Sequence, residues 1–91
     1  MKTIEVIKQK CEIKKNEVIT ELSSKIDFSQ GIDKAINSLA DIDSQINTKL
    51  KPLGEDIKLI IESSNEDKDV LEKQASVIME NTLSEIFGKF F

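Results

Sequence analysis

The stretch IDKAINSLADIDSQINTKLKPLGEDIKLI, from Ile32 to Ile60, decides the fold. Its large apolar residues recur at steps of three or four residues that average 3.5, a spacing that places side chains along one side of an α-helix. They are Ile32, Ile36, Leu39, Ile42, Ile46, Leu50, Leu53, Ile57 and Ile60. Because so long an apolar stripe is unfavourable in water, the segments before and after it must cover it.

The run Lys51-Pro52-Leu53-Gly54 favours a break in this helix. Proline costs about 3 kcal/mol in a helix interior, and glycine costs up to about 1 kcal/mol more. The 3.5-residue period nevertheless passes through Pro52 without a shift. We therefore expect a helix over about 29–62 that is kinked or briefly interrupted at 51–54 and keeps one direction, with a reversal of the chain at Pro52 as the alternative.

Two further helices are predicted, over about 3–26 and 65–88. The apolar stripe of the first comprises Ile4, Ile7, Cys11, Val18, Leu22 and Ile26. That of the second comprises Leu71, Ala75, Ile78, Met79, Leu83, Ile86 and Phe90. Asp27 or Ser29 is the expected start signal of the middle helix, and Ser63 or Ser64 that of the last helix.

These elements predict a single all-α domain over 1–91, a three-helix up-down-up bundle with a long second helix. The first and third helices would be parallel and flank the second. The second helix is expected to overhang the others, so that either a second chain or residues 53–62, folded back at the kink, must cover the excess.

Composition restricts the function. The 91 residues carry a net charge of −4, with 13 basic residues that are all Lys, no His, no Trp and no Tyr. Without Arg and with few aromatic side chains, the chain lacks the usual means of binding nucleic acid. Without His, and with no arrangement of residues typical of catalysis, we expect neither an enzyme nor a cofactor. The absence of a signal peptide or a membrane-length apolar run predicts a cytoplasmic protein, although export without a cleaved signal stays open.

The residues that could carry chemistry have simpler interpretations. Cys11 falls on the apolar stripe of the first helix, so we expect a buried thiol that does not react. Asp41 and Asp43 open like a calcium loop, but Ile46 and Pro52 occupy positions that require Gly and Glu. The acidic run that starts at Glu66 is expected to form the N-terminus of a helix. No metal site is therefore predicted.

Several apolar residues lie off the three stripes. They are Val6, Ile13, Leu59, Val70 and Val77, and in the expected topology they gather at one end of the bundle. Phe87, Phe90 and Phe91 form an apolar C-terminal group that either closes the bundle, which we favour, or anchors a partner. We predict that these eight residues bind a partner.

The sequence therefore predicts a non-enzymatic protein–protein interaction module that presents an apolar helix face to a groove or helix. It would act as a small adaptor, inhibitor or chaperone, or assemble with itself as a coiled-coil-like oligomer. The alternative is a membrane-proximal regulator or secreted helical partner that uses the C-terminal Phe residues. Membrane docking is the less favoured of these, because the surrounding helix is acidic and anionic lipid would repel it.

Overall fold

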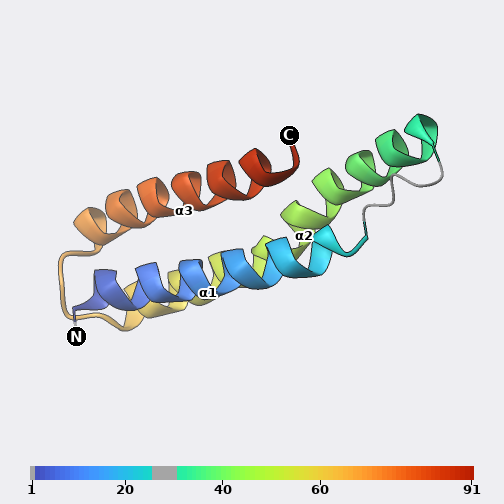
Figure 1. Ribbon diagram of the computed structural model, residues 1–91. Coiled ribbons are helices and arrows are strands. Elements are labelled where there is room, and N and C mark those ends of the chain that lie inside the picture. Colours follow the sequence, from blue (N-terminus) through green and yellow to red (C-terminus); the bar gives the residue numbers. More distant parts are fainter. Residues whose placement is uncertain (1, 26–30) are drawn as a thin grey trace.

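The computed structural model, which describes residues 2–25 and 31–91, confirms the all-α three-helix bundle. The helices are α1 (Thr3–Ser23), α2 (Ile32–Ser63) and α3 (Lys68–Phe90). They run up, down and up, so that α1 and α3 are parallel (Figure 1). Each helix packs on both others, so α1 and α3 also contact one another instead of only flanking α2.

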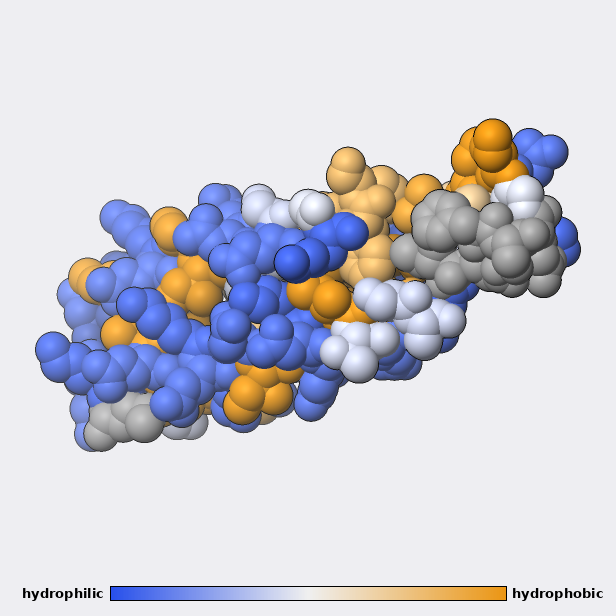
Figure 2. All heavy atoms as spheres, viewed as in Figure 1, coloured by the Kyte–Doolittle hydropathy of each residue, from blue (hydrophilic) through white to orange (hydrophobic). Residues whose placement is uncertain are grey.

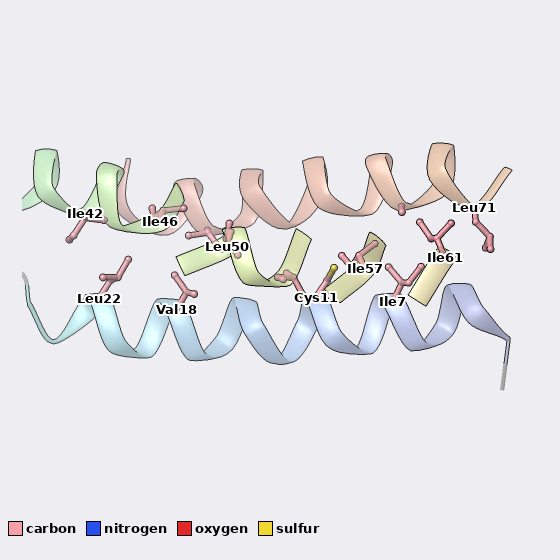
Figure 3. Close-up of a cluster of buried hydrophobic side chains, with 13 residues drawn as sticks. Ile7, Cys11, Val18, Leu22, Ile42, Ile46, Leu50, Ile57, Ile61 and Leu71 are labelled. Carbon is pink, nitrogen blue, oxygen red and sulfur yellow. The ribbon is translucent and has the colours of Figure 1, made fainter. Parts of the chain in front are cut away.

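The core lies along the line where the three helices meet. The middle of the predicted seam is buried there, from Ile42 to Ile57, together with four residues of α1. In Figure 3, Leu22 of α1 lies opposite Ile42 and Ile46 of α2. The fully buried large side chains are Ile7, Leu22, Ile42, Ile46, Ile86, Val18 and Cys11. The core is thus formed by the apolar faces that the sequence predicted for α1, for the middle of α2 and for α3.

At the C-terminal end of α2 the seam moves by one residue. Ile61 is buried and Ile60, the predicted seam residue, is half-buried. Thr82, which the stripe of α3 omitted, is also buried. Its hydroxyl donates a hydrogen bond of 2.8 Å to the carbonyl oxygen of Ile78, one turn earlier. Because this bond satisfies the hydroxyl within the helix, Thr82 packs as a small residue of the core.

Helix α2 continues through Pro52 without interruption, and the chain does not reverse there. Pro52 itself is exposed, whereas Leu50, Leu53 and Ile57 around it are buried. Burying one such side chain contributes about 1.5–3 kcal/mol, so three of them outweigh the cost of about 3 kcal/mol for a helical proline. Packing therefore keeps the helix in phase on both sides of Pro52.

The helix ends differ from the predicted ones. Helix α3 begins at Lys68 instead of residue 65, because the carboxylate of Asp67 accepts hydrogen bonds from the backbone N–H groups of Asp69 and Val70 and caps the helix. The predicted cap Ser63 is the last residue of α2, and Ser64 follows it as the C-cap. Helix α1 ends at Ser23, short of residue 26. Asp27, Ser29 and the predicted start of the middle helix lie outside the described residues.

The N-terminus of α1 is capped from a distance. Lys2 at its N-cap position makes no side-chain capping bond. Instead, the carboxylate of Glu66, in the loop after α2, accepts a hydrogen bond of 3.2 Å from the backbone N–H of Thr3. The hydroxyls of Thr3 and Ser64 share a second bond of 3.2 Å. Hydrogen bonds from the side chain and backbone of Thr3 lower the pKa of Glu66. The loop between α2 and α3 thus fixes the start of α1.

Two groups of ion pairs link α1 to the other helices, farther along α1 from its N-terminus. The Nζ atom of Lys15 lies 2.6 Å from Glu85 of α3 and 2.8 Å from Glu12 on its own helix. The Nζ atom of Lys49 on α2 lies 2.6 Å from Glu21 of α1, and this hydrogen bond lowers the pKa of Glu21. Ion pairs this exposed contribute little stability, but they favour one register of the helices over neighbouring ones.

Ile46 is 0% exposed, so its replacement tests the position of the core. We expect Ile46→Ala to lower the free energy of unfolding by about 2–5 kcal/mol and Ile46→Glu to unfold the chain. Urea denaturation followed by circular dichroism measures both. Ile13→Glu, at an exposed position, is the control and should melt close to the unmodified protein. Equal losses from Ile46→Glu and Ile13→Glu would mean that the core is misplaced.

The lowered pKa values of Glu66 and Glu21 predict how stability depends on pH. A carboxylate whose pKa is lower in the folded state stabilises the fold above its unfolded pKa, and this stabilisation disappears as the pH falls through the folded pKa. The free energy of unfolding should therefore fall below about pH 4.5. In Glu66→Gln the fall should be smaller, so that its stability approaches that of the unmodified protein near pH 3. Parallel curves for the two proteins would contradict the capping role of Glu66.

Candidate functional site

The first three turns of α2 project beyond the rest of the bundle. Helix α2 has 32 residues and is about 48 Å long, whereas α1 and α3, with 21 and 23 residues, are about 32 and 35 Å long. Figure 1 shows the N-terminal end of α2 extending past the ends of α1 and α3. We call residues 32–41 the α2 extension. The predicted overhang therefore exists, but it is at this end, and residues 53–62 belong to the bundle.

The apolar seam continues along the α2 extension without cover from another helix. Ile32 is 77% exposed and Ile36 is 57% exposed, although both belong to the same stripe as the buried Ile42. Leu39 is half-buried, and only the small Ala35 is buried. The expectation that the whole stripe is covered within the chain is thus wrong for its first two turns, because the neighbouring helices end before they reach it.

The C-terminal Phe residues lie at the end of α3. Phe87 and Phe90 are half-buried and pack against the core, whereas Phe91 is 66% exposed. The ring centroids of Phe87 and Phe91 are 5.7 Å apart. Figure 2 shows apolar atoms gathered over the end of α3, beside the projecting part of α2. Phe87 and Phe90 thus cover the core at this end, whereas Phe91 adds exposed apolar surface at the end of α3.

A second apolar surface lies between α1 and α2. Val6 and Leu59 line one shallow hollow, and Ile13 and Pro52 line another. We call these four residues the α1–α2 face. Val6 is half-buried, and the other three are exposed. Charged side chains line the second hollow as well, namely Lys10, Lys14, Glu17 and Asp56. The apolar residues of this face are therefore separated by charges, unlike those of the α2 extension.

The predicted cluster of leftover apolar residues is divided between surfaces. Val6 and Leu59 do meet, but Ile13 lies halfway along α1. Val70 and Val77 are exposed on α3 and line neither hollow of the α1–α2 face. The prediction that partner binding uses all eight residues is not tested by this arrangement. The structure has two surfaces with exposed apolar residues, the α2 extension and the α1–α2 face.

Cys11 is a core residue, as the sequence predicted. It is 1% exposed, and its Sγ atom lies 3.8 Å from the Sδ atom of Met79 on α3. Burial raises the pKa of the thiol, while a hydrogen bond to Thr82 opposes this shift. A neutral buried thiol is a poor nucleophile, so this residue contributes packing between α1 and α3.

The thiol of Cys11 should accordingly react slowly in the folded protein. We expect a disulfide reagent that reports free thiols to label Cys11 at least about a hundred times more slowly in buffer than in denaturant, because only the exposed thiolate attacks. Absorbance stopped-flow measures both rates. Fast labelling in buffer, with an unchanged circular dichroism spectrum, would place Cys11 at the surface.

The acidic residues singled out in the sequence have structural positions. Asp41 and Asp43 are exposed along α2, and Asp67 caps α3. Within residues 2–25 and 31–91, no three His, Cys, Asp or Glu side chains gather as a metal ion requires. In the same described part of the chain, no helix combines the length and apolar content needed to cross a membrane.

Comparisons with known proteins matched no family model, no curated protein and no solved structure. The geometry of the two apolar surfaces is therefore the basis for an inference about function.

Proposed function

We propose that this chain is a non-enzymatic protein-binding module whose docking surface is the α2 extension. The observation that carries the proposal is the exposure of Ile32 and Ile36 on a stripe that is buried everywhere else along the middle of α2. Amphipathic helices commonly bind by laying such a stripe on a groove or on another helix. The chain would then serve as a small adaptor, inhibitor or chaperone.

An apolar stripe that no other part of the protein covers is unfavourable in water. Covering the side chain of an Ile or Leu contributes about 1.5–3 kcal/mol, and the α2 extension offers Ile32, Ile36 and part of Leu39 to a partner. Single exposed apolar residues are common on protein surfaces, but Ile32 and Ile36 are exposed one turn apart on the same helix face, followed by the half-buried Leu39. A partner that covers these residues completes the bundle.

The α1–α2 face is the weaker candidate. Lys10, Lys14, Glu17 and Asp56 share a hollow with Ile13, so a partner there must pair or displace these charges. Desolvating unpaired charges opposes binding, which the α2 extension avoids along its apolar stripe. We therefore assign the binding function to the extension and use the α1–α2 face as the comparison.

Two matched substitutions test this assignment. Ile36 and Ile13 are the same residue type and are 57% and 59% exposed, so Ile36→Glu and Ile13→Glu make the same chemical change at similar exposure. Both variants should melt close to the unmodified protein. We expect Ile36→Glu to reduce the protein captured from a lysate of the producing cells by about 30-fold, which corresponds to one buried Ile side chain, and Ile13→Glu to leave it unchanged. Quantitative mass spectrometry of the captured proteins provides the measurement.

Light scattering after size exclusion, over a wide concentration range, identifies the kind of partner. A dimer or larger assembly that Ile36→Glu dissociates would make the partner a second copy. A monomer would leave the α2 extension available for a different protein. If Ile13→Glu rather than Ile36→Glu abolished capture, the function would belong to the α1–α2 face. If neither variant changed capture or mass, the proposed docking role would be wrong.

A further inference from the structure

Two residues that border the apolar stripe of the α2 extension, Asp33 and Asp43, are acidic. Asp33 lies three residues before Ile36, and Asp43 lies four residues after Leu39, spacings that place both on the side of the stripe. Both are exposed, and neither makes an ion pair within the described residues. The stripe is thus flanked near each end by a carboxylate that points to solvent.

The one basic residue of the α2 extension lies elsewhere on the helix. Lys34 is two residues before Ile36 and five before Leu39, spacings that place it on the opposite side from the stripe. Asp41 shares that opposite side, and its carboxylate accepts a hydrogen bond from Gln45. Along α2, the charged residues beside the stripe of the α2 extension are therefore negative.

This charge pattern decides between a second copy and a different partner. If two α2 extensions pair antiparallel with Ile32 of one copy against Leu39 of the other, Asp33 lies across from Ser38 and meets no basic residue of the extension. If they pair parallel, Asp33 faces Asp33 and Asp43 faces Asp43. Like charges oppose association in the parallel orientation, and the antiparallel orientation offers the carboxylates no basic residue, so neither orientation is complementary. A partner with basic residues beside its own apolar stripe is complementary in both orientations.

We infer that the α2 extension binds an amphipathic helix of another protein whose apolar stripe is bordered by Lys or Arg. This inference rests on the proposed function and specifies the chemistry of the partner. The partner's apolar residues cover Ile32, Ile36 and Leu39, while its basic residues reach Asp33 and Asp43. The apolar contact supplies most of the affinity, and the charges select the partner.

Two synthetic peptides test the charge selection. Both are amphipathic helices of about 18 residues, long enough to form a helix, with Leu at every third or fourth position. One peptide carries Lys at the positions that border the stripe, and the other carries Glu. Fluorescence anisotropy with labelled peptide and the full chain gives the two dissociation constants. We expect the Lys peptide to bind about tenfold more tightly, and the preference to shrink as salt is raised.

Three variants distinguish the effect of Asp33 and Asp43 from the effect of the net charge of the protein. Asp33→Lys with Asp43→Lys should reverse the preference toward the Glu peptide. Glu55→Lys with Glu80→Lys changes the net charge equally at two exposed positions outside the α2 extension and should keep the preference for the Lys peptide. Ile36→Glu should weaken both peptides by about 30-fold. Circular dichroism confirms that each variant remains helical.

Each result decides the inference separately from the proposed function. Equal binding of the two peptides, or a preference that survives Asp33→Lys with Asp43→Lys, would overturn the charge selection while leaving the α2 extension as a docking surface. If Glu55→Lys with Glu80→Lys abolished the preference for the Lys peptide to the same extent, the preference would depend on net charge alone. That result would also overturn the charge selection by Asp33 and Asp43. If neither peptide binds, the inference fails, and the lysate comparison of Ile36→Glu with Ile13→Glu still decides the proposed function.

Discussion

The difference in length between α2 and its two partners is the constraint on which the rest of the structure depends. Helix α2 is nine residues longer than α3 and eleven longer than α1. One apolar seam therefore has two different environments. From Ile42 to Ile57 it is the centre of a bundle, and before Leu39 it is a surface. The same side-chain pattern that stabilises the fold in one place creates a candidate binding site in the other.

The end of the bundle away from the α2 extension is held by polar contacts that position its three helices. The loop after α2 supplies Glu66 to the backbone of Thr3, and Asp67 caps the helix that follows. This loop thus satisfies one exposed N–H group at the start of α1 and two at the start of α3. Because these helices start at the same end and are both shorter than α2, they also leave the same end of α2 uncovered.

The sequence predicted which faces pack but not where packing stops. Periodicity identifies the direction of a side chain, so the burial of Ile42, Ile46, Leu50 and Leu53 followed from spacing alone. Periodicity contains no information about how long the neighbouring helices are. The exposure of Ile32 therefore could not be predicted from the spacing of its own stripe. The cap at Asp67 was one of several acceptors in a polar run, and only the backbone geometry distinguishes it. Thr82 was missed because its polarity is satisfied by its own helix.

The way the α2 extension is built bears on how strongly it can bind. A helix of three turns alone is marginal in water, because starting a helix costs more than its few hydrogen bonds return. In α2 the buried half of the helix is already formed, so the α2 extension only continues an existing helix. A partner therefore meets an apolar stripe that is ordered in advance, and little of the contact energy is spent on folding the site. Such preorganisation would let a surface of so few large side chains, Ile32, Ile36 and Leu39, suffice for the proposed docking.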